Sequence, residues 1–289
     1  MENTEVKKEN KITFKKLLAV IIISLVLIIT AAVLFLCLRP DDLYTVTEAK
    51  YDALGFDAPQ TLKYNYDETG RLSSINVDGK NRYLYSYTDD GKTVTIENKA
   101  DNTKRTIKFN DNFDVIEKVY SDGTNETFTY DRKGKLISSV NTNGVKITYY
   151  YDGKNIIAED YSSGERVEYE YAGKRILSEV VYNVNGKSHF TFYHYNDNKT
   201  LAKKDMIYDA INYEYDSKKR VISQTNNSEV SMSFSYDEHG NITSISYPTP
   251  ATMEYTYEKV DIPESIYKLN KTLITYNDVL TEETVELLR

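Results

Sequence analysis

Three histidines, His189, His194 and His239, are the side chains best suited to metal binding or proton transfer. His189 and His194 are five residues apart, which would place them on opposite faces of a strand, so they could not share one metal ion. His239 lies in a turn-like run, Asp-Glu-His-Gly at 237–240. The sequence contains no motif typical of zinc proteases, serine hydrolases or phosphate-binding loops. We therefore expect no catalytic residue, no cofactor site and no metal site, and predict that the protein is not an enzyme.

Acidic residues offer two weaker kinds of chemistry. The runs 110–112 (Asn-Asp-Asn) and 89–90 (Asp-Asp) carry oxygen ligands for calcium but lack the spacing of a dedicated calcium loop. Carboxylate pairs could also serve glycoside hydrolysis, but acids occur along the whole chain and no pair stands out. Calcium binding therefore stays open, and a carbohydrate-active enzyme is the least favoured alternative.

An uncharged segment at residues 17–38 is long enough to cross a membrane as a helix. Its 22 residues would span about 33 Å, against about 30 Å for a hydrocarbon core. The preceding tail, residues 1–16, is rich in lysine. The positive-inside rule places this tail in the cytoplasm and the rest of the chain outside. A cleaved signal peptide, the alternative, would have a shorter apolar core. Cys37 is expected to face lipid, because Leu36 stands where lipidation requires a small residue. We predict an uncleaved, single-pass membrane anchor.

The charge of the chain restricts its partners. The formal net charge is −8, and residues 1–39 carry +3, which leaves −11 for the predicted external part. A nucleic-acid partner would require a basic surface, so none is expected.

An aromatic residue recurs about every 21 residues between residues 62 and 259. The intervals between successive copies are 21, 22, 21, 21, 20, 24, 20, 21 and 21 residues. A second aromatic precedes each one by two residues, except in the third copy, where Ile107 stands. About ten copies of one unit therefore make up this segment. The anchor residues are Tyr66, Tyr87, Phe109, Tyr130, Tyr151, Tyr171, Tyr195, Tyr215, Tyr236 and Tyr257.

Turn residues and then an aliphatic residue follow each anchor. Where the turn glycine is missing, Asn112 and Asn198 are expected to replace it, since asparagine also tolerates positive φ. A second turn, such as Asp78–Gly79, closes most units. Each unit thus predicts strand, turn, strand and turn. The expected fold class is an all-β repeat protein, an antiparallel hairpin meander forming a curved or spiralling β-strip.

The first copy shows how these residues would be used. Tyr64 and Tyr66 should lie on one face of a strand, because side chains alternate along it. Asp67 would form the turn, Gly70 would supply the positive φ, and Leu72 would pack in the core. Tyrosine suits a thin sheet because its ring covers apolar surface while its hydroxyl reaches water. Packing is the favoured interpretation. The alternative is a stacking surface for sugars, which exposed rings flanked by carboxylates on the concave side would favour.

The pattern aromatic-x-Tyr-Asp-x-x-Gly-[Lys/Arg]-Leu, seen at Tyr64–Leu72, resembles the YD repeat of the Rhs family. The ten copies cover about two thirds of the chain. The resemblance implies a repeat β-architecture and a surface location, and it supplies no catalytic residues. In large members the strip closes into a shell around a C-terminal toxin. Here ten units look too few to enclose such a payload, and neither an Asp-Pro-x-Gly cleavage segment nor a toxin-sized domain follows. The sequence leaves open whether the strip closes.

The segments beside the repeats are predicted to cap them. Residues 39–61 are interpreted as a juxtamembrane spacer and N-terminal cap, and residues 260–289 as a C-terminal cap over the last strand edge. Within the latter, Asp261–Glu264 is interpreted as a break and Leu273–Leu280 as a degenerate unit. A short C-terminal helix is expected at Thr281–Arg289.

These features together predict a membrane-anchored, extracytoplasmic, non-enzymatic interaction scaffold. Its ligand would be a glycan, a cell-wall polymer or a surface protein. The second hypothesis is an accessory or remnant of a polymorphic toxin system, and it rests on the family resemblance alone.

Overall fold

In the computed structural model, the described residues are 42–53, 58–183, 186, 188–227, 231–247 and 251–275. The chain divides into two units, Met1–Leu43 and Tyr44–Arg289, and the fold below is that of the second. The predicted basic tail, the transmembrane segment 17–38 with Cys37, and the predicted helix Thr281–Arg289 all lie outside the described residues. Within the described part of the chain, no helix is both long and apolar enough to cross a membrane.

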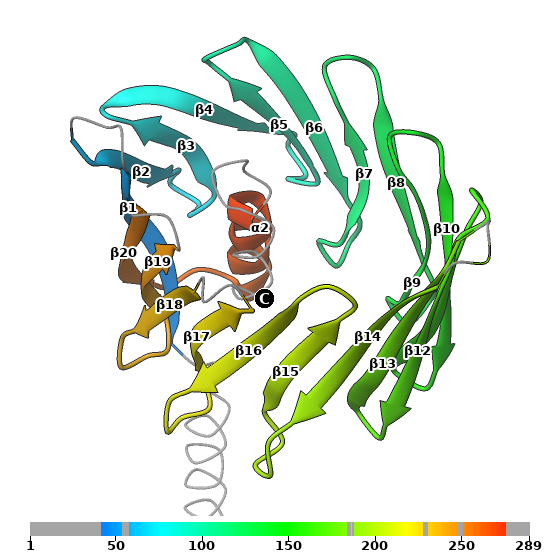
Figure 1. Cartoon of the computed structure of the whole chain (residues 1–289). Helices are drawn as coiled ribbons and strands as arrows, with labels where there is room; N and C mark the ends of the chain where they lie inside the picture. Colours follow the sequence, from blue (N-terminus) through cyan, green and yellow to red (C-terminus); the bar gives the residue numbers. More distant parts are fainter. Residues whose placement is uncertain are drawn as a thin grey trace, which may run out of the picture. The chain divides into compact units, whose positions relative to one another are not determined.

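One continuous antiparallel sheet contains the twenty described strands (Figure 1). Strands that follow one another in the sequence pair through short turns, which confirms the predicted hairpin meander. The strands are β1 (Leu43–Ala53), β2 (Gln60–Tyr66), β3 (Leu72–Val77), β4 (Lys80–Tyr87), β5 (Thr93–Asn98), β6 (Thr103–Phe109), β7 (Val115–Val119), β8 (Asn125–Tyr130), β9 (Leu136–Val140), β10 (Lys146–Asp152), β11 (Asn155–Tyr161), β12 (Arg166–Ala172), β13 (Arg175–Tyr182), β14 (Ser188–Tyr195), β15 (Leu201–Met206), β16 (Ala210–Tyr215), β17 (Val221–Asn226), β18 (Ser231–Tyr236), β19 (Ile242–Tyr247) and β20 (Ala251–Val260).

The sheet is closed, because β1 pairs with β2 on one side and with β20 on the other. Across this seam the hydroxyl of Thr47 donates a hydrogen bond of 3.3 Å to the carbonyl of Thr256. The meander is therefore a closed shell, not an open or spiralling strip. The segment 39–61, predicted as a spacer, contains the strand β1 that completes it.

A β-bulge at the aromatic anchor bends most of the repeats. In the first repeat, Tyr66 pairs with Leu72 while Asn65 pairs with Ser74, so that Ser73 is the extra residue. Since bulges bend a strand and increase its twist, a bulge recurring in successive repeats supplies curvature for closure. Register shifts of this kind also occur at Phe109, Tyr130, Tyr151, Tyr171, Tyr195, Tyr215 and Tyr236.

The turn after several anchors is built on the Asp or Asn that follows the anchor. One carboxylate oxygen of Asp67 accepts the backbone N–H groups of Thr69 at 2.9 Å and of Arg71 at 3.0 Å, and Gly70 has a φ of +80°. The predicted roles of Asp67 and Gly70 are thereby confirmed. The same pair of bonds recurs at Asp131, Asp216 and Asp237.

The predicted substitutes for the turn glycine are wrong. Positive φ falls on Phe113 (+58°) and Lys199 (+72°), not on Asn112 or Asn198. Phe113 and Lys199 stand three residues after the Asp or Asn of the turn, the same place that Gly70 takes after Asp67. The hydrogen bonds of the turn therefore decide which position adopts the left-handed conformation. That position is glycine in most turns, but it stays left-handed where another residue occupies it.

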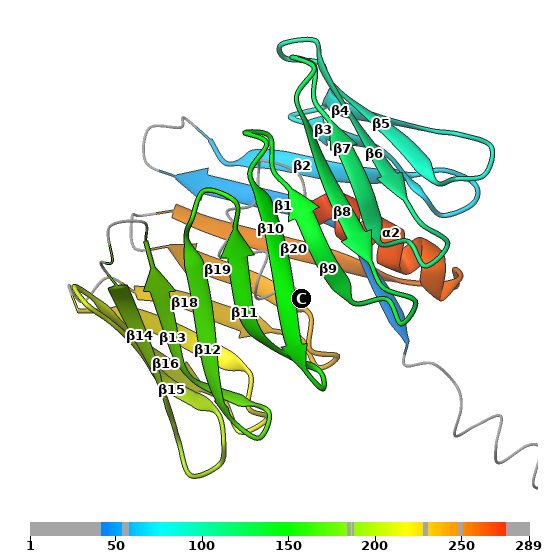
Figure 2. The same cartoon turned by 90° about the vertical axis from the view of Figure 1, so that its right-hand side faces the viewer.

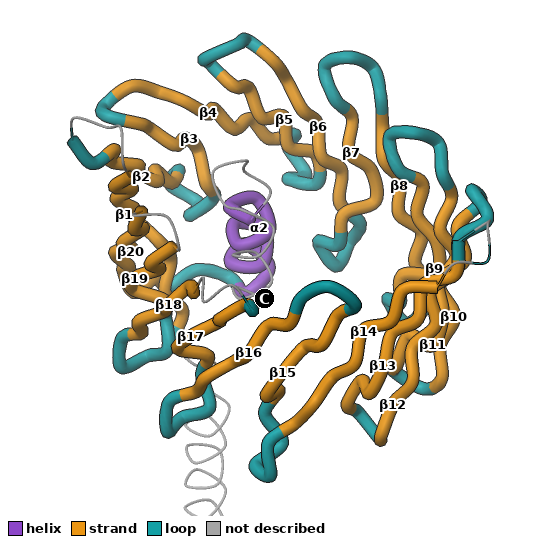
Figure 3. The backbone as a smooth tube through the Cα atoms, in the orientation of Figure 1, coloured by secondary structure: helices purple, strands orange, loops and turns teal. Residues whose placement is uncertain are grey.

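The helix α2 (Glu264–Thr275) lies inside the closed sheet (Figure 3). Its Leu269 and Leu273 are fully buried in one apolar cluster with Leu72, Ile75 and other residues of β1–β7 and β18–β20. In Figure 2 the helix lies toward β1 and β6 and away from β14 and β15. The buried apolar cluster of the described residues thus lies on the side of the interior that the helix occupies.

The helix corrects two predictions for the C-terminal segment. Leu273, assigned to a degenerate repeat, is helical, and the presumed break at Asp261–Glu264 leads into the helix, because the Pro263 carbonyl accepts the amides of Ile266 and Tyr267. The last strand edge is covered by β1 rather than by this segment. Apolar residues at 266, 269 and 273, just after a proline, were the sequence signal for a helix.

Candidate functional site

The anchor tyrosines bind the preceding repeat through their hydroxyl groups. Tyr87 donates a hydrogen bond of 2.5 Å to the carbonyl of Leu72, the aliphatic residue of the preceding unit. We call this contact the tyrosine clasp. The same clasp links Tyr130 to Val115, Tyr151 to Leu136, Tyr171 to Ile156, Tyr195 to Ile176 and Tyr236 to Val221. Tyr66 makes it with Val46 of β1 at 2.7 Å, so β1 replaces a preceding repeat.

The cation that precedes the aliphatic residue covers the clasped ring. Arg71 pairs with Asp67 at 3.1 Å, and its guanidinium carbon lies 4.6 Å from the centre of the Tyr87 ring. Lys135 lies 4.7 Å from the Tyr151 ring and Arg220 4.5 Å from the Tyr236 ring. The side chains of the YD motif thus contact one another, as the packing interpretation predicts. Few of their polar groups remain for a ligand.

A different set of side chains lines the inner face away from the helix. The register places Tyr149 opposite Glu159 and Tyr169 opposite Glu179, on the same face of the sheet as Tyr64 and Leu72. In β10–β14 the tyrosines and glutamates of this face are half-buried, unlike the buried side chains beside α2. Half-buried tyrosines and glutamates thus share this part of the inner face with aliphatic side chains such as Val167.

Hydrogen bonds join these tyrosines to the two glutamates. Glu159 accepts the hydroxyls of Tyr161 at 2.9 Å and of Tyr169 at 3.0 Å, and Glu179 accepts that of Tyr193 at 3.0 Å. Burial, followed by the charge of Glu159, raises the pKa of Tyr169 well above its ordinary value, so the hydroxyl keeps the proton it donates. We call these five residues the inner Tyr–Glu rows.

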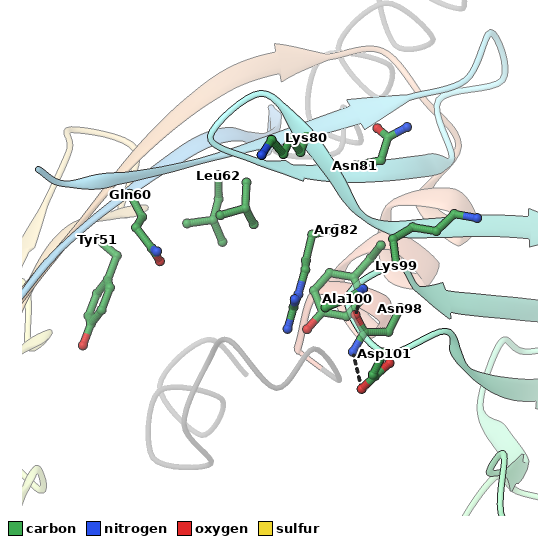
Figure 4. A pocket seen from close by; sticks show the side chains of 12 residues that line it. Tyr51, Gln60, Leu62, Lys80, Asn81, Arg82, Asn98, Lys99, Ala100 and Asp101 are labelled. Carbon is green, nitrogen blue, oxygen red and sulfur yellow. Dashed lines mark hydrogen bonds between the residues drawn. The ribbon is translucent and has the colours of Figure 1, made fainter. Parts of the chain in front are cut away.

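A pocket of about 750 Å³ opens at the ends of the first strands (Figure 4). We call it the rim pocket. Arg82 stands in it between Leu62 and the hydrogen-bonded pair Asn98 and Asp101. Its lining residues are Tyr51, Gln60, Leu62, Val77, Lys80, Asn81, Arg82, Tyr83, Asn98, Lys99, Ala100 and Asp101.

The histidines singled out in the sequence are not among the residues of either feature. In β14 His189 pairs with Val181, and the His194 Nε2 atom lies 3.7 Å from Asp205. His239 stacks on Tyr44, with ring centres 4.4 Å apart, and shares a hydrogen bond of 3.1 Å with its hydroxyl.

The acidic runs considered for calcium have protein partners. Asp90 accepts hydrogen bonds from the Thr88 hydroxyl and the Lys92 amide, and Asp111 pairs with the Lys92 ammonium group. Among the described residues, no three His, Cys, Asp or Glu side chains are grouped so that they could hold a metal ion.

The model of the teneurin YD-shell family matches residues 26–193 and 166–278, most of the chain. The chain belongs to this family. The resemblance to YD-repeat proteins of the Rhs kind, drawn from the 21-residue period, is thereby confirmed. A comparison with curated proteins gave no match.

Solved structures with similarity to this YD shell are distant. The crystal structure of TcdB2-TccC3-TEV matches with a TM-score of 0.36 and 12% identity, over 78% of this chain and 17% of that one. A porin-like protein from Bacteroides vulgatus matches with a TM-score of 0.34 and 14% identity, over 74% and 99%. The YD shell spans only about a sixth of the first of these chains. Similarity at this level carries no functional argument.

Proposed function

We propose that this YD shell is a non-enzymatic scaffold that binds a polysaccharide outside the cell, anchored by residues 17–38. The observation that supports this most is the inner Tyr–Glu rows, where tyrosine rings stand beside Glu159 and Glu179 on the concave side of the sheet. Exposed rings flanked by carboxylates would distinguish a sugar-binding surface from packing, and these rings are half-buried, so part of each ring is open to a ligand.

The two kinds of side chain suit two parts of a sugar. Tyrosine rings offer flat apolar surface to the C–H face of a pyranose, while carboxylates accept hydrogen bonds from its hydroxyl groups. An ionised carboxylate has about four acceptor positions. Glu159 uses two of them and Glu179 one for the tyrosine hydroxyls, so both keep acceptor capacity for a ligand.

The proposed location rests on charge. The lysines before residues 17–38 favour a cytoplasmic tail and therefore an external shell. An accessory role in a toxin system has only family membership behind it, whereas a polysaccharide ligand has specific residues.

Binding of the full-length chain to insoluble chitin, cellulose and peptidoglycan tests the proposal. The doubly substituted chain Glu159→Gln, Glu179→Gln keeps the size of both side chains but removes their charge. Its matched control is Glu170→Gln, Glu214→Gln, which alters two exposed glutamates on the opposite face of the same sheet. We expect the inner pair to weaken binding at least about tenfold, or about 1.4 kcal/mol, and the control to bind as the original chain.

Two results would refute the scaffold. The first is no binding of the original chain to any of the three polymers at micromolar concentration. The second is equal weakening by the inner and outer substitutions. Release of soluble sugar during the incubation, lost in the inner variant, would instead identify an enzyme.

A further inference from the structure

We propose that the rim pocket binds an anionic monosaccharide, a sugar that carries a carboxylate or a phosphate group. The anion would be held by Arg82, with Lys80 at the margin of the pocket. The volume of about 750 Å³ lies in the range of small-molecule sites, roughly 300–1,000 Å³.

Arg82 is placed by an irregularity of the sheet. Between β3 and β4, Ile75 pairs with Tyr83 while Asn76 pairs with Asn81, so Arg82 is the extra residue of a bulge. Bulges of this kind redirect a side chain and are frequent beside binding sites. This one lies next to the second turn of its unit, away from the anchor bulges that curve the sheet.

The guanidinium group of Arg82 is available for a ligand. Its guanidinium carbon lies 5.8 Å from the centre of the Tyr83 ring, and in the described part of the chain no carboxylate forms an ion pair with it. Hydrogen bonds from Thr103 lower the pKa of Asp101, and the nearby charge of Arg82 adds to this lowering. Arginine offers a planar set of donors that matches carboxylate and phosphate groups.

The rest of the pocket suits a sugar ring. Gln60, Asn81 and Asn98 carry amide groups that can both donate to and accept from hydroxyls. Leu62 and Tyr83 also line the pocket and give it an apolar part. Lys99 pairs with Glu97 at 2.9 Å, which leaves Arg82 and Lys80 as two lining cations against the one lining acid, Asp101.

This inference is independent of the proposed function, because the rim pocket and the inner Tyr–Glu rows share no residue. Calorimetric titration of the full-length chain with glucuronate, glucose 6-phosphate and glucose tests it. The variants are Arg82→Gln and Lys80→Gln, the second at an exposed position whose change leaves packing intact. Arg132→Gln, at an exposed turn of another repeat, is the matched control.

We expect glucuronate or glucose 6-phosphate to bind at least tenfold more tightly than glucose, and the preferred one identifies the anion. Arg82→Gln should weaken that binding at least tenfold and Lys80→Gln about threefold, with no change for Arg132→Gln. The proposal is overturned by equal binding of glucose, by no binding of either anion at millimolar concentration, or by unchanged affinity in both pocket variants.

Discussion

Asn270, on α2, accepts a hydrogen bond of 2.9 Å from the backbone amide of Leu72, 198 residues earlier in the chain. The same side chain donates 2.7 Å to the carbonyl of Gly70. Asn270 is only 1% exposed, so both contacts are shielded from water. One amide group thus attaches the internal helix to the turn of the first repeat.

Replacing Asn270 with alanine should destabilise the shell by about 2–3 kcal/mol, because a buried N–H and a carbonyl each lose their partner. Denaturant unfolding followed by circular dichroism measures the change. Asn212→Ala, at an exposed position with a weak bond of 3.4 Å, should cost under about 0.5 kcal/mol. Equal effects of the two variants would show that the helix contact adds nothing.

Gly70→Ala should be more damaging than the same change at Gly134. Both glycines have a φ near +80°, so the backbone strain is shared. At Gly70 a new Cβ would lie 2.5 Å from Cγ2 of Ile262, whereas at Gly134 it would meet nothing within 4 Å. We expect a cost of about 1 kcal/mol at Gly134 from the backbone. The substitution Gly70→Ala should lower the free energy of unfolding by about 1–3 kcal/mol more than this. Thermal unfolding of both variants decides this, and similar midpoints would disprove the clash.

Removing the hydroxyl of one tyrosine clasp should cost about 1 kcal/mol. Tyr151→Phe deletes the bond of 2.7 Å to the Leu136 carbonyl but keeps the ring beneath Lys135. Tyr236→Phe does the same at a distant repeat, and the two losses should add. Tyr208→Phe, at a position 90% exposed, is the control and should change nothing. Denaturant midpoints that do not differ among the three would contradict a structural role for the clasp.

The shell should lose stability in alkali through its tyrosines. Burial raises the pKa of Tyr66 to about 12, against about 10 in an unfolded chain. A group whose pKa is raised by folding stabilises fully below its unfolded pKa, and that contribution is lost as the pH rises through the folded value. We expect the free energy of unfolding to be flat up to about pH 10 and to fall toward pH 12. Tyrosinate absorbance and circular dichroism, recorded together between pH 9 and about pH 12, test this. Ionisation of the tyrosines without a fall in the free energy of unfolding would refute it.

Local features of the fold could be predicted from the sequence because each one depends on neighbouring residues. The pair Tyr64 and Tyr66, the turn at Asp67 and the packing of Leu72 follow from spacing within one unit. Closure could not be predicted, since it depends on curvature summed over all the bulges and on β1, which lacks the repeat pattern.

The candidate sites were less accessible to prediction than the fold. Glu159 and Glu179 stand in variable positions of their units, and only the register of β10–β14 brings them beside tyrosine rings. Arg82 is placed by a bulge that no motif marks. The predicted asparagines failed for a related reason, because the turn hydrogen bonds decide the conformation.

The pairing of β1 with β20 also has a consequence for the order of folding. β1 is synthesised first and β20 about two hundred residues later, so one edge of β1 must wait without its partner while the repeats between them form. Bringing such distant segments together costs loop-closure entropy before the contact between them repays it, which makes closure a late step. A chain interrupted before β20 would hold two unpaired edges at once, each able to recruit the edge of another unfinished molecule. The pairing of β20 with β1 therefore removes both unpaired edges at once.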